Sequence, residues 1–353
     1  MISVCMIVKD EARHLEKTLQ ALAPHFDDIV VVDTGSTDHS REIARQFVPQ
    51  VHEFRWVDDF SAARNHSIQF ARHDWVLVID ADETLAALDA EPLLALMQAQ
   101  PDAVGRINMI NHAGENEETE RINRLFRKSR YGYQGLIHEQ ICPHADAPNF
   151  ACFDAPITLH HLGYQTDILQ EKDKLNRNVK LLEAALSLAP EDPYLHYQLG
   201  KTHYIHRNYP AACTCLERSL QLQAGHFFEY SEDLIETYGY ALINSGQYTQ
   251  ALKVLDYEKY CPSTDFVFLK ALIYMNNADM QQAVDHFLAC TRMPPGRKKG
   301  VHSFKALYNI GVILECLGNN EDALVFYQNC EGYSPALEGI TRLHATKRPT
   351  GYV

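Results

Sequence analysis

The sequence predicts two domains of different fold class, an α/β domain followed by an all-α repeat domain. Two observations predict this division. Short apolar runs alternate with segments of helical spacing over residues 2–80, which is the pattern of a parallel sheet covered by helices. From Lys172 onward the spacing is helical throughout, and small residues recur at fixed offsets, as in stacked repeats. We place the two domains at residues 1–170 and 171–353.

The α/β domain is expected to contain strands joined by helices. Apolar runs predict strands at residues 2–8, 29–32, 51–56, 75–79 and 104–110. Helices are expected around Leu15, Leu19 and Leu22, at residues 38–47 and at residues 60–71. Ser61 is the expected N-cap of the third helix. Residues 111–120 are polar and acidic, so we expect an exposed loop there.

Composition and charge exclude several classes of function. The chain has 353 residues, of which 46% are apolar, and its net charge of −14 argues against general nucleic-acid binding, which needs a basic face. The nine cysteines form no Cys-x-x-Cys pair, as expected of reduced thiols. No apolar run approaches the roughly 18 residues of a membrane span, and residues 1–8 lack the basic start of a signal peptide. We therefore expect a cytoplasmic protein without a transmembrane segment.

Three acids end the strand that starts at Trp75, in the order Asp80-Ala-Asp82-Glu83. On an extended backbone Asp80 and Asp82 would point the same way, and they would repel unless a cation lay between them. Hard oxygen ligands suit Mg²⁺ or Mn²⁺, which often complete their shells with substrate phosphates. The alternative is that these acids cap a following helix. Their position after a buried strand favours a ligand site.

Asp33 closes the strand at residues 29–32 and is followed by Thr-Gly-Ser-Thr-Asp38. A turn at Gly35 and a helix start at Asp38 explain the other residues of this segment. They do not explain Asp33, which could accept hydrogen bonds from a nucleobase or a ribose. The chain has neither a Gly-x-Gly-x-x-Gly nor a P-loop motif, so neither of those nucleotide-binding classes is supported.

Four segments together closely resemble the motifs of family 2 glycosyltransferases of GT-A fold. They are Cys5-Met-Ile-Val-Lys-Asp-Glu11, Val32-Asp-Thr-Gly-Ser-Thr-Asp38, Phe60-Ser-Ala-Ala-Arg-Asn65 and Asp80-Ala-Asp82-Glu83. The resemblance implies a Rossmann-like domain that binds a UDP-sugar together with Mn²⁺ or Mg²⁺. It implies that Asp33 binds the uridine base, that Asp80 contacts the ribose or the ion, and that Asp82 ligates the metal on the diphosphate.

The same resemblance implies further residues of the donor pocket. Arg64 and Asn65 match the segment that faces the nucleotide, where Arg64 could pair with a phosphate through two hydrogen bonds. Val8, Lys9 and Glu11 line the pocket by the same analogy. The alternative for Arg64 and Asn65 is that both are surface residues of an amphipathic helix.

A second group of candidate residues follows Arg124. Glu139, next to His138 and after an apolar pair, could act as a general base that deprotonates an acceptor. The alternative is a structural Glu139 paired with Arg124 or Arg127. Arg-Leu-Phe-Arg followed by Gly-x-x-His-Glu resembles a subset of the family that includes lipopolysaccharide-core glucosyltransferases and sublancin-type peptide S-glycosyltransferases. That resemblance implies Glu139 as the catalytic base and His138 as a neighbour of the donor sugar.

Two adjacent histidines, His160 and His161, point opposite ways if they lie on a strand, so one of them can face a given site. His161-Leu-Gly-Tyr164 resembles the His-x-Gly-Tyr segment of the same subset. The resemblance selects His161, whose imidazole could complete the shell of a Mn²⁺ ion. The alternative is a histidine with a purely structural role.

Four helical pairs are predicted in the second domain, because one pattern of small, small and large residues recurs four times. The sets are Gly200, Ala212 and Leu216; Gly239, Ala251 and Leu255; Ala271, Ala283 and Phe287; and Gly311, Ala323 and Tyr327. These offsets resemble tetratricopeptide repeats, in which small residues let paired helices approach closely. Residues 335–345 are expected to cap the last apolar face. Residues 176–188 are expected to join the domains.

The repeats are expected to present a surface for an extended peptide or for a second copy of the chain. Tyr194, Tyr197 and Tyr204 are the predicted lining of that surface. Residues 293–300 form a basic, helix-breaking stretch, Met-Pro-Pro-Gly-Arg-Lys-Lys-Gly. We interpret it as a solvated connector, with contact to an acidic partner as the alternative.

The leading hypothesis is a metal-dependent, inverting glycosyltransferase that moves a hexose from a UDP-sugar to a peptide, protein or glycan acceptor, such as a peptide Cys or Ser side chain. One alternative is a repeat-protein scaffold whose nucleotide-binding domain is inactive. Another is a glycosyltransferase of lipopolysaccharide-core type. A nucleotidyltransferase is disfavoured, because no glycine-rich phosphate loop lies near the first strand.

Overall fold

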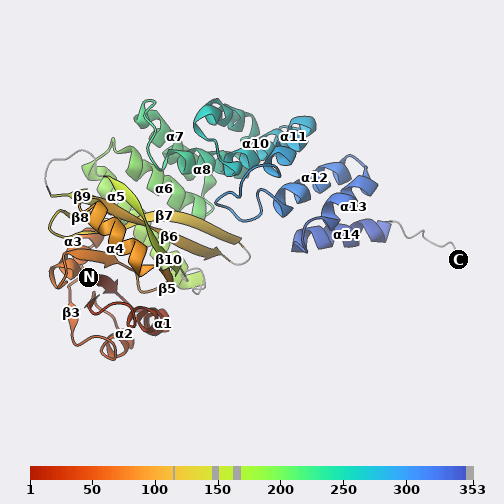
Figure 1. Cartoon of the computed structure of the whole chain (residues 1–353). Helices are drawn as coiled ribbons and strands as arrows, with labels where there is room; N and C mark the ends of the chain where they lie inside the picture. Colours follow the sequence, from red (N-terminus) through yellow and green to blue (C-terminus); the bar gives the residue numbers. More distant parts are fainter. Residues whose placement is uncertain (114–115, 145–150, 162–167, 347–353) are drawn as a thin grey trace. The chain divides into compact units, whose positions relative to one another are not determined.

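The computed structural model describes residues 1–113, 116–144, 151–161 and 168–346. The chain forms two compact units, Met1–Leu188 and Ala189–Val353. Helix α5, Ile168–Leu188, ends the first unit, so the helix that we expected to join the domains is counted with the α/β part. The α/β domain and the helical repeat domain predicted from the sequence are both present (Figure 1). The predicted boundary after residue 170 remains a prediction.

An eight-stranded mixed sheet forms the centre of the first unit, in the order β3-β2-β1-β4-β7-β6-β10-β5. Its strands are β1 Ile2–Val8, β2 Ile29–Asp33, β3 Val51–Glu53, β4 Trp75–Val78, β5 Glu83–Leu88, β6 Val104–Ala113, β7 Asn116–Arg127 and β10 Cys152–His161. β1 to β4 pair in parallel, β7 is antiparallel to β4 and β6, and β10 is parallel to β6 but antiparallel to β5. A separate hairpin pairs β8, Tyr131–Gln134, with β9, Gln140–Pro143.

These strand directions bring the predicted acids to one edge of the sheet. The carboxyl ends of β2, β4 and β10 and the first residue of β5 all lie at that edge, since β5 runs opposite to the other three. Asp33 is the last residue of β2 and His161 the last of β10, while Asp80 follows β4 and Glu83 opens β5. Only β1 lies between β2 and β4. Asp33 and Asp80 are therefore about two strand spacings, or roughly 10 Å, apart.

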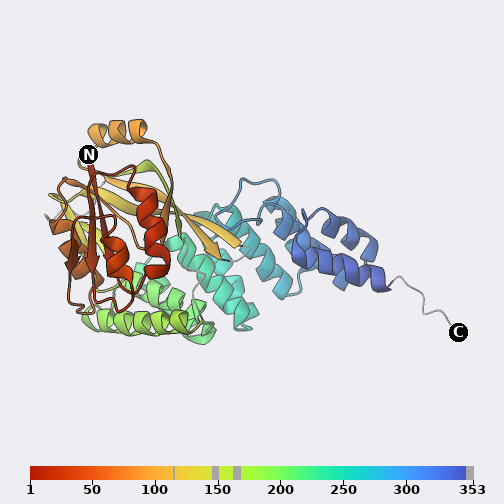
Figure 2. The ribbon, with the colours of Figure 1, turned by 90° about the horizontal axis from the view of Figure 1, so that it is seen from below.

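Helices cover both faces of this sheet. On one face, α1 (Ala12–Leu22) and α4 (Ala90–Ala99) pack buried side chains such as Leu19 and Met97 against β-strand residues. On the other face, α3 (Phe60–Gln69) buries Ile68 against valines of β2 and β4 together with tyrosines of the β8–β9 hairpin. The short helix α2 spans Ser40–Ala44. Figure 2 shows α1 against the strands and the β6–β7 hairpin extending beyond them.

Several sequence expectations for this unit were wrong. Asp59, not Ser61, caps α3, because its side chain accepts the backbone N–H of Ala62. Residues 111–120 are not a loop where they are described but the ends of the paired strands β6 and β7. The acids after β4 lead into β5 rather than into a helix, so the helix-cap alternative is wrong. The polar and acidic composition of these strand ends hid them from hydrophobic periodicity.

The second unit consists of helices. They are α6 Pro193–Ile205, α7 Tyr209–Gln223, α8 Ser231–Asn244, α9 Tyr248–Ala251, η2 Leu252–Tyr260 (a 3₁₀ helix), α10 Thr264–Asn276, α11 Met280–Cys290, α12 Phe304–Cys316, α13 Asn320–Gln328 and α14 Ser334–Thr346. Ala336 and Leu343 of α14 are buried against Tyr327, which confirms the predicted cap. Within the described ranges, no helix has both the length and the apolar composition that crossing a membrane would require.

Close approach at small residues is confirmed for two of the predicted helical pairs. A Cβ atom on Gly200 would lie 2.6 Å from Leu216 Cγ, and one on Gly311 would lie 2.6 Å from Tyr327 Cε1. The prediction for Gly239 was wrong in its partner, since a Cβ there would meet Leu269 of α10 at 2.7 Å. The reason is that α9 is one turn long and continues as 3₁₀ helix.

Two predictions about the surface of the repeats were also wrong. Tyr197 is 4% exposed and stacks on Tyr230 at a centroid distance of 4.9 Å, so it belongs to the core rather than to a lining. Tyr194 and Tyr204 are partly buried against the same core. The basic stretch 293–300 is not a solvated connector, because Lys298 Nζ donates to the buried Glu236 at 2.7 Å.

Candidate active site

The loops after β1 and β2 are joined at the carboxyl edge of the sheet. Val8 O accepts hydrogen bonds from Thr34 N at 2.9 Å and Thr34 Oγ1 at 3.2 Å. Glu11 N donates to Ser40 Oγ at 2.8 Å, and Lys9 is exposed. Val8, Lys9 and Glu11 therefore border Asp33, whose strand pairs with theirs. Their part in donor binding stays a prediction.

Asp33 is 2% exposed and held by its own loop. It accepts hydrogen bonds from Gly35 N at 3.0 Å and Ser36 N at 3.1 Å, and Arg41 Nη2 lies 2.6 Å from its Oδ2. Gly35 adopts a φ of +109°, which L side chains rarely adopt. Burial alone would raise the pKa of Asp33, but the hydrogen bonds from Ser36, Arg41 and Gly35 outweigh it and lower the pKa. The carboxylate is thus charged and fixed in place, with Arg41 as a partner that the sequence did not indicate.

Asp80 and Glu83 close a tight turn rather than continuing β4. Glu83 N donates to Asp80 O at 3.1 Å, and Asp80 N donates to Glu83 Oε2 at 2.8 Å. Thr18 Oγ1 of α1 donates to Ala81 O at 2.8 Å and anchors the turn. The expectation of an extended backbone was wrong here. The turn gives Asp80 and Asp82 different neighbours.

Asp80, whose side chain is 30% exposed, lies within a largely buried group that we call the arginine–carboxylate cluster, made of Arg64, Arg124, Asp80, Glu83 and Glu139. Arg64 Nη1 lies 2.8 Å from Asp80 Oδ1, and Arg64 Nε pairs with Glu139. Arg124 Nη2 lies 3.1 Å from Asp80 Oδ2 and 2.8 Å from Glu83 Oε1. The cluster therefore holds three carboxylates against two guanidinium groups.

This geometry corrects two sequence interpretations. Arg64 is 7% exposed, so the alternative of a surface arginine is wrong. Glu139 does pair with an arginine, as its structural alternative supposed, but with Arg64 rather than Arg124 or Arg127. Arg127 instead pairs with Asp74 at 2.6 Å. Glu139 thereby joins the same cluster as Asp80.

The charge balance of the cluster is reflected in the pKa values of Asp80 and Glu83. Burial would raise the pKa of Asp80, but Arg64 and Arg124 outweigh burial and hold the pKa well below its usual value. Burial raises the pKa of Glu83 to about 7, because the nearby negative charges of Asp80 and Asp82 oppose the effect of Arg124. The negative charge of Glu83 is therefore not fully compensated by the two arginines of the cluster.

Asn65 positions the segment that carries Glu139. Its Nδ2 donates to Tyr133 O and its Oδ1 accepts Tyr133 N, both at 2.8 Å. Phe60 N at the start of α3 donates to Leu136 O at 2.9 Å. After Gly135 the chain turns, and His138 has a φ of +50° just before Glu139. The amide of Asn65 is taken up by this pairing, and its predicted contact with the nucleotide stays a prediction.

Asp82, in the turn before β5, faces His161 at the end of β10. Their Oδ2 and Nε2 atoms lie 3.4 Å apart, because His161 of β10 is in register with Glu83 of β5. His161 Nδ1 lies 3.0 Å from Asn111 Oδ1 on β6. Burial alone would lower the pKa of His161, but Asp82, Glu83 and Asp80 raise it. Residues 162–164 of the His-x-Gly-Tyr motif lie outside the described residues.

This pair is suited to share a divalent cation. If Asn111 accepts the Nδ1 proton of His161, the Nε2 lone pair faces Asp82, as in metal sites whose histidine is oriented by a second residue. Among the described residues there is no group of three His, Cys, Asp or Glu side chains that could hold a metal. A site with two protein ligands fits an ion that is completed by substrate phosphates. Asn111 had no signal in the sequence beyond its place on a predicted loop.

A cavity of about 580 Å³ lies elsewhere in this unit. It is lined by residues including Asn65, Asp74, Lys128, Tyr131 and His144, and by none of the clustered carboxylates. The converging charged groups at the sheet edge, and not this cavity, supply what a nucleotide diphosphate and its cation need.

The fold and this edge define an α/β domain with charged groups converging at one edge of its sheet, followed by helical repeats. Comparison with protein families agrees. Residues 3–152 match the model of glycosyl transferase family 2, and residues 264–297 match a tetratricopeptide repeat. The chain therefore carries a glycosyl transferase family 2 domain followed by tetratricopeptide repeats.

Three curated relatives share part of their length with this chain. A TPR repeat-containing protein of Synechococcus elongatus is 35% identical over 56% of this chain and 51% of its own length. The prophage-derived glycosyltransferase SunS of Bacillus subtilis is 27% identical over 62% of this chain and 53% of its own. The lipopolysaccharide core biosynthesis glycosyltransferase LpsC of Rhizobium meliloti is 27% identical over 42% of this chain and 59% of its own length. The matches thus span about half the length of these relatives.

Proposed function

We propose that the first unit is a metal-dependent, inverting glycosyltransferase that transfers a hexose from a UDP-sugar to a peptide, protein or glycan acceptor. One observation carries the proposal. The arginine–carboxylate cluster and the Asp82–His161 pair lie at the same sheet edge as Asp33, in a domain of glycosyl transferase family 2. Open α/β sheets bind ligands at this edge.

The donor would lie along this edge. Asp33 would accept hydrogen bonds from the uracil, with Val8, Lys9 and Glu11 beside it. Asp80 would contact the ribose or the ion from its place between Arg64 and Arg124. The roughly 10 Å between Asp33 and Asp80 is a distance that a nucleoside diphosphate can span.

Asp82 and His161 would hold a Mn²⁺ or Mg²⁺ ion. Their donor atoms, a carboxylate oxygen and an imidazole nitrogen 3.4 Å apart, suit Mn²⁺ in particular. When bound, the ion supplies Lewis-acid stabilisation of the charge on the departing diphosphate. The arginine–carboxylate cluster would supply the remaining fixed charges around the leaving group.

Glu139 would act as the general base. It would take the proton of the acceptor hydroxyl or thiol as that atom forms a bond to the anomeric carbon, while the bond from that carbon to the diphosphate oxygen breaks. Direct displacement of this kind inverts the anomeric centre. Arg64 pairs with Glu139 and holds it in position. His138, whose φ is +50°, would lie near the donor sugar.

The acceptor is proposed from the whole arrangement of the chain. The Arg-Leu-Phe-Arg and Gly-x-x-His-Glu segments, followed by repeats that can bind an extended peptide, favour a Cys or Ser side chain of a peptide. The similarity to LpsC, whose name assigns it to lipopolysaccharide core biosynthesis, favours a glycan as the second candidate.

Intact-mass analysis tests this function. Candidate peptides and glycans are incubated with mixed UDP-sugars and Mn²⁺, with the parent protein and with Asp82→Ala. The proposal predicts a mass increase of one hexose with the parent and none with the variant. Hydrolysis of the UDP-sugars is followed in parallel. If neither the parent nor the variant shows transfer or hydrolysis with any donor and acceptor, the inactive scaffold is the better interpretation.

A further inference from the structure

The second unit contains a buried acidic group that we call the acidic triad, made of Asp233 and Glu236 of α8 and Asp265 of α10. The side chain of Glu236 is 1% exposed and that of Asp233 13%. Asp265 is fully buried. Buried carboxylates are unfavourable unless they are paired, so this group requires a cationic partner.

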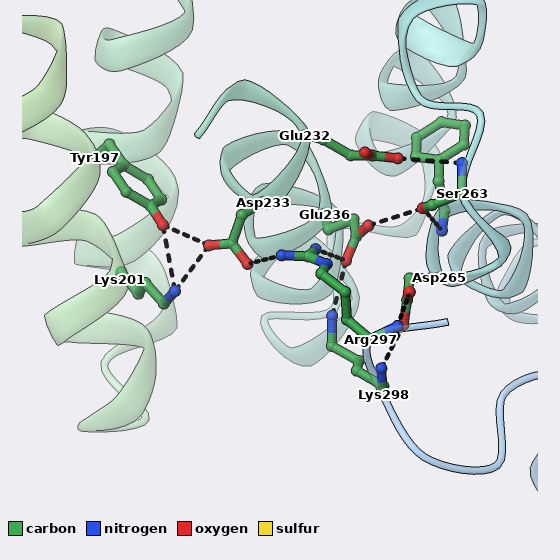
Figure 3. Close-up of polar contacts among 10 residues, drawn as sticks. Tyr197, Lys201, Glu232, Asp233, Glu236, Ser263, Asp265, Arg297 and Lys298 are labelled. Carbon is green, nitrogen blue, oxygen red and sulfur yellow. Dashed lines mark hydrogen bonds and ion pairs between the residues drawn. The ribbon is translucent and has the colours of Figure 1, made fainter. Parts of the chain in front are cut away.

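The partner is the basic loop between α11 and α12 (Figure 3). Arg297 donates from Nη1 to Asp233 at 3.2 Å and from Nη2 to Glu236 at 2.9 Å. Lys298 Nζ donates to Glu236 at 2.7 Å. The backbone N–H groups of Arg297 and Lys298 both donate to Asp265, at 2.7 and 2.9 Å. The triad thus contacts the side chains and the amides of two consecutive residues.

Gly296, the residue before Arg297, is also required to be small by its neighbours. A Cβ atom on Gly296 would lie 2.4 Å from Asp265 Oδ2 and 2.8 Å from Val301 Cγ2. Asp265 could not accept the two amides if the chain were held away from it by a side chain. The recognised feature is therefore the sequence Gly-Arg-Lys in a conformation that directs the backbone amides of Arg297 and Lys298 at the same carboxylate, that of Asp265.

Among the described residues, one further cation pairs with the triad, and it cannot balance the three acids. Lys201 Nζ donates to Asp233 at 2.9 Å, and Tyr197 Oη donates to the same oxygen at 2.5 Å. Lys201, Arg297 and Lys298 together match the three carboxylates. Without the loop, three buried acids would face one ammonium group, and Glu236 and Asp265 would lose every charged or amide donor named above.

We infer that the acidic triad is a binding site for a Gly-Arg-Lys peptide segment, and that this chain fills the site with its own residues 296–298. A tethered segment acts at a high effective concentration and excludes a free segment of the same chemistry. A basic peptide or protein segment can therefore bind only where the loop has been displaced. This site is independent of the proposed transferase activity, because none of its residues belongs to the first unit.

The test uses the full chain and a fluorescein-labelled peptide with the sequence Pro-Pro-Gly-Arg-Lys-Lys-Gly. The variant Arg297→Ala/Lys298→Ala removes the two cationic side chains of the loop from the site and leaves Lys201 on Asp233. Fluorescence anisotropy is expected to show at least tenfold tighter binding of the peptide to this variant than to the parent. Adding Glu236→Gln to the variant should remove that gain. Arg342→Ala is the matched control, since it removes an arginine that pairs with Glu315 and not with the triad, and it should give no gain.

A second peptide, with Ala in place of the glycine that precedes Arg, distinguishes recognition of the Gly-Arg-Lys backbone from general charge attraction. It should bind the double variant at least tenfold more weakly. Equal binding of the two peptides, or no gain over the parent in a variant with a parental circular dichroism spectrum, would overturn the inference. If the double variant does not fold, millimolar Gly-peptide should restore a cooperative melting transition, and failure to restore it would equally overturn the inference.

Discussion

The two units each contain a largely buried cluster of three carboxylates, but the clusters differ in how their charge is balanced. In the first unit Asp80, Glu83 and Glu139 face two arginines, Arg64 and Arg124. In the second unit the acidic triad faces Lys201, Arg297 and Lys298. Since uncompensated buried charge is unfavourable, an excess of acids indicates where an external cation is expected. A balanced group indicates that the chain supplies its own.

The surroundings of the clusters sharpen this difference. The first has two more groups beside it, Asp82 and His161, that reach the same sheet edge and can hold an ion. The second is covered by a loop whose Gly296 permits close backbone contact with Asp265. The first arrangement is suited to bind a diphosphate and its cation, and the second to bind a peptide backbone with its basic side chains.

The largest expected effect is on catalysis by the first cluster. Glu139→Gln keeps the shape of the side chain but removes the base, so turnover should fall by about 10²–10⁴-fold while UDP binding stays near parental. UDP release and calorimetry measure the two quantities. Glu42→Gln, an exposed acid of α2, is the matched control and should leave turnover unchanged. Unchanged turnover in Glu139→Gln would remove Glu139 from this role.

Next in size is the stability that Arg64 gives to the first unit. Arg64→Ala leaves the buried Glu139 without its arginine and leaves Asp80 with Arg124 alone. Removing one partner of a buried pair costs about 3–5 kcal/mol. Both tryptophans, Trp56 and Trp75, lie in this unit. Tryptophan fluorescence in urea therefore reports its unfolding.

The control for Arg64 is an exposed arginine of the same unit. Arg72 is 61% exposed and pairs with Asp27 and Asp28. Arg72→Ala should cost less than about 1 kcal/mol, as surface ion pairs do. Equal losses in the two variants would contradict the distinction between a buried cluster and a surface pair.

A smaller loss of stability is expected when the balanced cluster of the second unit is changed. Arg297 is 31% exposed, and Arg297→Ala leaves Lys298 and Lys201 in place. We expect a loss of about 1–3 kcal/mol, the range for leaving buried polar groups unsatisfied. Far-UV circular dichroism in urea should show an earlier transition of the helical unit. The tryptophan transition should stay where it is in the parent, and a shift of it would show that the effect is not local.

The smallest effect is expected at the end of the repeats. Arg342 is 54% exposed and donates two hydrogen bonds to Glu315, at 2.7 and 2.8 Å. Because water already solvates this pair, Arg342→Ala should lower the free energy of unfolding by less than about 1 kcal/mol. The same urea transition measures it. A loss as large as that of Arg297→Ala would show that burial does not rank these arginines.

The sequence predicted most of the parallel half of the sheet and the acids at its edge. The reason is that buried parallel strands are continuous apolar runs, so that an acid at their end, such as Asp33 or Asp80, stands out. The resemblance also selected Arg64 and Glu139, which the structure brings into one cluster. Their roles in binding and catalysis remain proposals.

The rest of the site depends on pairings that no local pattern encodes. β5 and β10 are far apart in the chain, and their register alone brings His161 next to the Asp82–Glu83 turn. Asn111 lies just beyond the predicted strand at residues 104–110, on the polar end of β6 that was predicted as a loop. In the second unit, a loop rich in Pro, Gly and Lys is typical of solvated connectors. Arg297 is fixed in place because Asp233 and Glu236 lie on a helix about 60 residues earlier.

Calorimetry of UDP binding with and without Mn²⁺ tests the central claim most directly, namely that the excess of acids in the first unit marks a nucleotide diphosphate site completed by a cation. The parent should take up UDP in the presence of Mn²⁺ and much more weakly without it. Asp82→Ala should lose this dependence on the ion, while Arg297→Ala in the second unit should keep it. If the parent takes up no UDP with Mn²⁺, the claim is contradicted.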